Sequence, residues 1–319
     1  GHVPRRRDRN RPSASSDRKG ALTRILALLG PTASGKTELA VRLAERLSAE
    51  IISVDSMQVY RGMDIGTAKP RMLERRGIPH HMIDIVDPHE EFSVAEFRAI
   101  GRRVLESSTA ETMIITGGSG LHFRALVDPM NFAPTDRETR DALEAEDHET
   151  LSSRLLTADP EAGAHVDLAN RRRVIRALEI HRLTGETPSR RAATAEAEDV
   201  RRYQSEIPFV AVGVDPGSAL ESRVDLRLER MRQGGLFEEV RRLAPTMGRT
   251  ASHAVGYREL LEVVAGKSDV DHAFTLAARN TKKLARRQRT WFQRDPRIRW
   301  IPWVGEVEAR VARAVEALE

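Results

Sequence analysis

An eight-residue segment near the start of the chain, Gly30-Pro31-Thr32-Ala33-Ser34-Gly35-Lys36-Thr37, has the spacing of a phosphate-binding loop. It follows an apolar stretch, 25–29, and precedes leucines and alanines at helical spacing. Glycines let the backbone wrap a phosphate, amides at a helix N-terminus donate to it, and Lys36 adds a mobile cation. The hydroxyl of Thr37 is suited to holding Mg2+. The segment therefore predicts phosphate binding without identifying the compound that carries the phosphate.

One carboxylate, Asp55, is the candidate for chemistry beside this loop. It follows the apolar stretch 51–54, and ligands of parallel sheets bind at the carboxyl ends of the strands. Most phosphotransferases of this type also need an acid after another strand, but the stretch 113–116 ends in threonine and glycine. Asp55 is interpreted as a metal ligand or a general base, with a turn or helix cap as the alternative.

Two further clusters of polar residues are candidates for the same site. Arg223 and Arg227 lie four residues apart, so they share one face of a predicted helix. They are suited to clamping a leaving diphosphate, or they belong to a solvated helix face. The pair His80-His81, with Asp84 and Asp87, fits no standard metal-site spacing and is interpreted as structural.

Two basic segments predict contact with a phosphate backbone. Residues 279–299 hold nine cations and one acid, and apolar residues at helical spacing leave the cations on the opposite face. Residues 171–176, Arg-Arg-Arg-Val-Ile-Arg, open another predicted helix. Each could be a solvated helix face, but the two together favour RNA.

The net charge of the whole chain indicates RNA binding less reliably than these two basic segments do. The 319 residues carry a net charge of +5, yet residues 1–24 hold eight basic and two acidic residues. The other 295 residues therefore hold 44 basic and 45 acidic residues. This basic tail, 1–24, is predicted to be disordered because it has too few apolar side chains to repay its ordering. It also lacks the apolar core of a signal peptide.

The absence of cysteine excludes disulfides, thiolate zinc sites, iron–sulfur clusters and cysteine nucleophiles. It fits a reducing compartment, so we expect a cytoplasmic protein. No stretch approaches the roughly 20 apolar residues that a membrane span requires. We therefore expect no membrane contact.

The order of apolar segments predicts an α/β fold. Expected strands at 25–29, 51–54, 82–86, 113–116 and 209–214 alternate with expected helices, of which the clearest are 94–105 and 220–231. This alternation is typical of a parallel sheet covered on both faces, here a P-loop core. The segment 134–206 is charged, alanine-rich and helical in period. We therefore predict a core domain of 25–133 and 207–319 interrupted by a helical insertion domain, 134–206.

Several motifs, taken in order, resemble the tRNA dimethylallyltransferases. The matching segments are GPTASGKT at 30–37, DSMQVYRGMDIGTAKP at 55–70, PHHMIDIVDP at 79–88, GGSGLHFRAL at 117–126, RRVIRALEI at 172–180, AVGYRE at 254–259 and ARRQRTWF at 285–292. The resemblance implies a P-loop core with a helical insertion. It also implies that residues 30–37 hold, together with Mg2+, the diphosphate of dimethylallyl diphosphate rather than ATP.

The resemblance implies a role for individual residues. Asp55 matches the general base at the adenosine N6 amine, while Lys36, Thr37 and Arg223 match groups that bind the leaving diphosphate. Arg227 is the alternative to Arg223 in that role. Ser119 stands where the family mostly has threonine, so its hydroxyl contact is expected to persist. His122 stands where the family mostly has tyrosine, so the phenol is lost.

The resemblance also implies contacts with the anticodon stem-loop of tRNA. The residues on matching segments are Asp55, Ser56, Met57, Gln58, Ser119, Arg140, Arg172, Arg173, Val174, Ile175, Arg176, His253, Gly256, Tyr257, Arg258, Arg286, Arg287, Gln288 and Trp291.

The implied activity is transfer of the dimethylallyl group from dimethylallyl diphosphate to N6 of adenosine 37, beside the anticodon, with release of diphosphate. We expect a monomer. The residues alone leave two alternatives, a small-molecule P-loop kinase and a non-catalytic RNA-binding protein.

Overall fold

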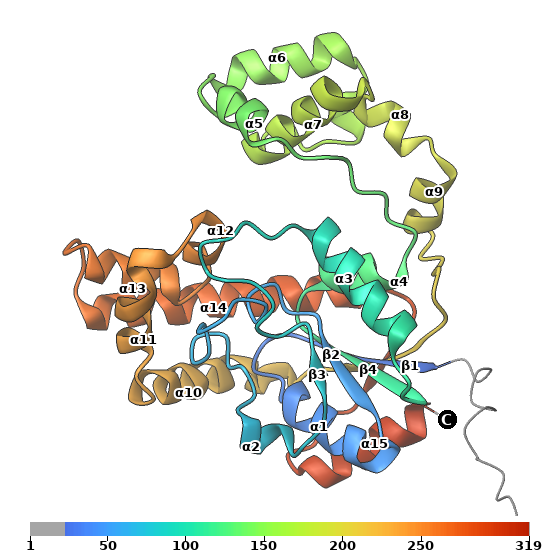
Figure 1. The fold of residues 1–319 in the computed structure, drawn as a ribbon, viewed down its shortest axis with the longest axis vertical. Helices are drawn as coiled ribbons and strands as arrows, with labels where there is room; N and C mark the ends of the chain where they lie inside the picture. Colours follow the sequence, from blue (N-terminus) through green and yellow to red (C-terminus); the bar gives the residue numbers. More distant parts are fainter. Residues whose placement is uncertain (1–22, 319) are drawn as a thin grey trace, which may run out of the picture.

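Six parallel strands form the central sheet of the protein (Figure 1). The structure is a computed structural model that describes residues 23–318, so the predicted tail lies almost wholly outside the described residues. The strand order is β3-β2-β4-β1-β5-β6. The strands are β1 (Arg24–Leu29), β2 (Glu50–Ser53), β3 (His80–His81), β4 (Thr112–Gly117), β5 (Val210–Val214) and β6 (Ile298–Ile301). The predicted α/β class is confirmed.

The sheet is apolar on both faces because helices cover each of them. Side chains alternate along β1, so Leu26 and Leu28 pack with α1 (Lys36–Leu47) and α15 (Val307–Leu318) on one face. On the other face, Ala27 and Leu29 belong to a larger buried cluster. That cluster includes residues of α3 (Val94–Ser107), α4 (Gly120–Val127), α10 (Leu220–Gln233) and α14 (Val270–Gln293). The two layers fix the carboxyl end of β1, from which the phosphate-binding loop leaves.

Shorter helices complete the core. They are α2 (Met72–Arg75), α11 (Leu236–Leu243), α12 (Arg249–Ser252) and α13 (Tyr257–Val264), with 3-10 turns at Gly217–Ala219 and Ala244–Thr246. Among all these described helices, none has both the length and the apolar character needed to cross a membrane.

The segment between α4 and β5 is helical and stands apart from the sheet in Figure 1. It contains α5 (Arg137–Glu144), α6 (His148–Ala158), α7 (Arg171–Thr184), α8 (Pro188–Ala192), α9 (Ala195–Arg201) and a 3-10 turn at Ala162–Ala164. Helices α5, α6 and α7 enclose a buried cluster of their own, which includes Leu143, Leu151 and Val174. The domain boundaries at 134 and 206 stay predictions.

Two expectations about elements are wrong. The expected strand at 82–86 is absent, because Met82 and Asp84 have φ angles of 63° and 57°, and only His80–His81 pairs with β2. The basic stretch 279–299 is not one helix, because α14 ends at Gln293 and residues 298–301 form β6. Neither β6 nor α15 was expected from the sequence.

Candidate functional site

The phosphate-binding loop joins β1 to α1 in a tightly constrained conformation. Gly35 has a φ of 84°, a left-handed value that glycine adopts without strain. Within the loop, Lys36 Nζ donates to the Pro31 carbonyl at 2.9 Å. The Ser34 side chain is fully buried, and its hydroxyl has no hydrogen-bond partner among the described residues. Buried hydroxyls are normally paired, so Ser34 indicates a ligand at this loop.

Asp55 leaves the end of β2 and closes the turn that follows. Its Oδ1 accepts from the backbone amides of Met57 at 2.9 Å and Gln58 at 3.4 Å. The carboxylate is half-buried and also lines both cavities described below. The interpretation as a turn cap is therefore correct, and it is compatible with a chemical role.

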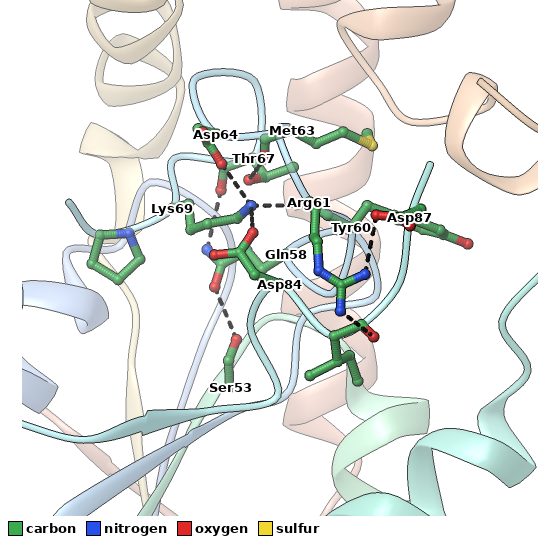
Figure 2. Close-up of polar contacts among 12 residues, drawn as sticks. Ser53, Gln58, Tyr60, Arg61, Met63, Asp64, Thr67, Lys69, Asp84 and Asp87 are labelled. Carbon is green, nitrogen blue, oxygen red and sulfur yellow. Dashed lines mark hydrogen bonds and ion pairs between the residues drawn. The ribbon is translucent and has the colours of Figure 1, made fainter. Parts of the chain in front are cut away.

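The chain that continues from Asp55 is held by the network shown in Figure 2. Lys69 Nζ donates to the Tyr60 carbonyl at 2.9 Å and to carboxylates of Asp64 at 2.7 Å and Asp84 at 2.6 Å. Gln58 contacts Ser53 Oγ at 2.9 Å and donates to the Thr67 carbonyl at 3.2 Å. Gln58 is buried in this network, so its amide is engaged inside the protein rather than presented to RNA.

Two cavities lie on either side of Asp55. The smaller, of about 40 Å³, is lined by polar groups that include Lys36, Thr37 and Thr116. The larger, of about 320 Å³, has an apolar wall that includes Val224, Leu228, Met231 and Leu236. The residues that line both are Thr32, Asp55, Thr67, Gly118, Arg227 and Gln288. The arrangement brings a phosphate-binding loop, a carboxylate and an apolar chamber together.

The two arginines of α10 occupy different places. Arg227 lines both cavities, and burial lowers its pKa while the charge of Asp55 opposes the shift. Arg223 lies at the loop itself, where its Nε donates to the Ala33 carbonyl at 2.7 Å. Burial lowers the pKa of Arg223 as well. Both arginines are thus close enough to the loop to assist in binding an anion.

Lys36 is a buried cation of the site whose pKa is lowered. Burial lowers its pKa to about 8, the charge of Arg227 adds to this shift, and the charge of Asp55 opposes it. A bound anion would raise this pKa again, because it favours the charged form of the lysine.

Ser119 caps α4 and contacts the residue that replaces the family's tyrosine. Ser119 Oγ lies 2.7 Å from Nδ1 of His122, and the ring of His122 packs edge-on against Phe97 at 4.6 Å. Burial lowers the pKa of His122 to about 4, so the imidazole is neutral at pH 7. The imidazole of His122 therefore packs against Phe97 and is held by its contact with Ser119.

Several residues expected to contact tRNA are engaged within the protein. Val174 and Ile175 are buried in the core of the helical segment, because they lie on the inner face of α7. Arg140 and Arg176 both contact the buried carboxylate of Glu179, at 2.9 Å and 2.7 Å.

The same is true of residues near the larger cavity. Tyr257 is fully buried and donates its hydroxyl to Glu239 at 2.5 Å. Gln288 accepts from the backbone amide of Thr32 at 2.8 Å, so it supports the phosphate-binding loop. Met57 packs against the core cluster.

Exposed residues remain both in the helical segment and in the core domain. Arg172, Arg173, His253, Arg258, Arg286 and Arg287 have exposed side chains, while Ser56, Gly256, Arg287 and Trp291 line the larger cavity. The cationic face of α14 is less free than its sequence indicates. Three of its cations pair with acids that precede or belong to α10, namely Lys282 with Asp225, Arg286 with Glu221 and Arg289 with Asp215.

Comparison with known proteins identifies the family. A model of the IPP transferase family matches residues 58–295. The chain belongs to the IPP transferase family. It is 43% identical to the tRNA dimethylallyltransferase of Bifidobacterium longum over 290 residues, which cover 87% of this chain and 86% of that protein. It is 44% identical to that of Streptomyces avermitilis over 288 residues, 87% and 90% of the two chains.

A solved structure of the family has the same fold. The tRNA isopentenylpyrophosphate transferase of Bacillus halodurans is 33% identical, with a TM-score of 0.66 over 92% of this chain and 96% of that one. The resemblance to the tRNA dimethylallyltransferases that the sequence motifs indicate is therefore confirmed.

The residues present are compatible with Mg2+. Among the described residues no group of three or more histidines and carboxylates converges as a protein-only metal site. Thr37 and Asp55 do line the same small cavity, and Mg2+ beside phosphates typically takes one or two protein oxygens, with water and phosphate completing its shell. The histidine pair considered above as a possible metal site makes contacts within the protein. His81 Nε2 lies 2.8 Å from the Glu50 carboxylate, and His80 Nδ1 lies 2.9 Å from the Ile78 carbonyl.

One residue of the site carries no sequence signal. Arg310 of α15 lies against the phosphate-binding loop, although it follows the last motif by about twenty residues. Only the packing of α15 beside α1 brings it there.

Proposed function

We propose that this chain transfers the dimethylallyl group of dimethylallyl diphosphate to N6 of adenosine 37 in tRNA, in the cytoplasm. One observation carries the proposal beyond the family: Asp55 lies between a phosphate-binding loop and an apolar chamber of about 320 Å³. The apolar wall of that chamber is suited to a five-carbon prenyl group carried by a diphosphate. The names of the relatives support the same reaction.

In the proposed reaction, the bond between the allylic carbon and the diphosphate oxygen breaks, and a bond from that carbon to N6 forms. The electron pair of the broken bond leaves on the diphosphate, so negative charge grows there. The amides of residues 30–37, Lys36 and the arginines of α10 stabilise that charge because they are fixed before the reaction. Asp55 takes the proton that the amine loses.

The remaining groups bind and orient the substrates. Ser119 presents its hydroxyl to the larger cavity, and the exposed arginines at 172, 173 and 287 bind the tRNA backbone. Mg2+, held by Thr37, would neutralise part of the diphosphate charge.

The direct test incubates the purified chain with unmodified tRNA, labelled dimethylallyl diphosphate and Mg2+. The expected result is label on the tRNA at adenosine 37, located by nuclease mapping. A parallel incubation contains ATP as well. Consumption of ATP without label on tRNA would contradict prenyl transfer and favour a kinase.

A substitution tests the base. Asp55→Asn keeps an oxygen for the Met57 amide but removes the proton acceptor, so we expect the rate of transfer to fall by about 10²- to 10⁴-fold. Binding of tRNA, measured by filter retention, should change little. Asp271→Asn, at an exposed acid paired with Arg232, is the matched control. An Asp55→Asn variant as active as this control would remove the assignment.

A further inference from the structure

Two arginines from different helices meet at the second glycine of the phosphate-binding loop. A Cβ atom placed on Gly35 would lie 2.6 Å from Arg310 Nη1, 3.3 Å from Arg223 Nη2 and 3.5 Å from the Trp303 ring. The guanidinium carbons of Arg223 and Arg310 lie 4.8 Å and 4.6 Å from the centre of that ring. Trp303 therefore contacts both cations at one point of the loop.

Arg310 is deeply buried and lacks a partner for its charge. Its residue is 4% exposed, and neither Nε nor Nη1 has a hydrogen-bond partner within residues 23–318. Arg223, by contrast, donates to the Ala33 carbonyl. Burial lowers the pKa of Arg310, and the neighbouring charge of Arg223 acts in the same direction, while Glu38 and Glu306 oppose it. An unpaired guanidinium in such a place destabilises the protein unless it binds an anion.

A second unpaired group belongs to the same loop. The Ser34 hydroxyl is also buried without a partner, one residue before Gly35. The N-terminus of α1, which begins at Lys36, points its free amides into this loop. Two side chains and a helix terminus at this one loop thus lack partners among the described residues, as expected of a loop that binds a phosphate.

We propose that Arg310 binds the diphosphate, as a second guanidinium beside Arg223, and that Trp303 holds the two in position. The identity of the ligand rests on the proposed function. Guanidinium groups bind phosphate oxygens through parallel hydrogen bonds, and a cation there would also stabilise the charge that develops on the leaving diphosphate.

The alternative is a purely structural role, in which Arg310 docks α15 against the core through Trp303. The two roles differ in their effect on stability. A structural arginine stabilises the protein without ligand, so its loss lowers the melting temperature. An anion-binding arginine carries an unpaired buried charge when no ligand is bound, so Arg310→Met should leave the melting temperature of the ligand-free protein unchanged or raise it.

The experiment titrates inorganic pyrophosphate with Mg2+ into the full chain by calorimetry. Arg310→Met should weaken binding by about 10- to 100-fold, the range expected for a hydrogen-bonded charge. Arg310→Lys keeps the charge but loses the paired N–H donors of the guanidinium, and should weaken binding by about tenfold. Arg313→Met, at another arginine of α15, should bind as the wild type does. The KM for dimethylallyl diphosphate should rise with the two Arg310 variants and not with Arg313→Met, and the KM for tRNA should change in none of them.

Pyrophosphate binding by Arg310→Met as tight as by Arg313→Met would overturn the proposal, and so would a wild type that binds no pyrophosphate. If Arg310→Met does not fold, Arg310→Lys decides: a wild-type affinity overturns the proposal. The result is independent of prenyl transfer. A chain that fails to modify tRNA, yet loses pyrophosphate affinity with Arg310→Met, contradicts the proposed function and leaves the role of Arg310 standing.

Discussion

Binding of diphosphate should weaken as the pH rises above 8, because Lys36 loses its proton there. The Lys36 side chain is buried, its Nζ donates to the Pro31 carbonyl at 2.9 Å, and its pKa is about 8 in place of 10.5. The protonated ammonium attracts the diphosphate and the neutral amine does not. The affinity is therefore full below pH 8 and falls as the pH passes above it.

The magnitude follows from the size of the shift. If only the protonated form binds, the affinity falls about tenfold for each pH unit above 8, which corresponds to about 1.4 kcal/mol per unit. At pH 9 the dissociation constant should be about ten times its value at pH 7. Binding above pH 8 should also take up a proton, because the bound anion raises the pKa of Lys36 again.

Calorimetric titration with inorganic pyrophosphate and Mg2+ between pH 6.5 and 9.5 measures both effects. The matched control is Lys36→Arg, which keeps a cation that does not titrate in this range. The ligand and Mg2+ titrate equally in both experiments, so the difference between the two profiles belongs to Lys36. Proton uptake appears as a dependence of the binding enthalpy on the buffer.

Profiles of equal slope for the wild type and Lys36→Arg would refute the reasoning. A second consequence concerns stability. The folded pKa of Lys36 lies below its unfolded value, so the unfolded chain binds more protons between about pH 8 and 10.5. Below pH 8 this costs the folded state about 3 kcal/mol. The cost falls away as the pH rises toward 10.5, so Lys36→Met should stabilise the protein without ligand at pH 7.

Three other changes test other parts of the structure. Gly35→Ala should weaken pyrophosphate binding by about tenfold, because a left-handed alanine costs about 1–2 kcal/mol and its Cβ, 2.6 Å from Arg310 Nη1, would displace that guanidinium; calorimetric binding within twofold of the wild type would contradict this. Glu239→Ala should lower the free energy of unfolding in urea by about 3 kcal/mol. The buried carboxylate accepts hydrogen bonds from three backbone amides of residues 64–66 and from the Tyr257 hydroxyl. A loss below about 1 kcal/mol would show that the turn at 64–66 is stable without these hydrogen bonds. Deleting residues 1–20 should leave kcat/KM for tRNA within about threefold of its wild-type value, because two basic segments with exposed arginines lie within the folded part. A tenfold loss would show that the basic tail contacts the RNA.

Features that depend only on neighbouring residues could be predicted from the amino-acid sequence. The glycine spacing of 30–37 predicts the phosphate-binding loop and the apolar periods predict the presence of α1. The same periods predict α3, α10 and four of the six strands to within two residues. These features are local, since hydrogen bonds and side-chain periodicity within a few residues produce them. The motifs that identify the family are equally local.

Tertiary structure alone decided which groups face the ligand. Gln288 and Thr32 are 256 positions apart, and Arg310 reaches Gly35 only because α15 packs beside α1. Charge along the sequence could not show that Glu179 engages two arginines, or that α10 and the turn before it provide acids for three cations of α14. A basic residue can bind RNA, pair with an acid or bind a phosphate. Which of these it does depends on the neighbours that folding brings to it. A linear pattern records the charge of a residue but not its partner.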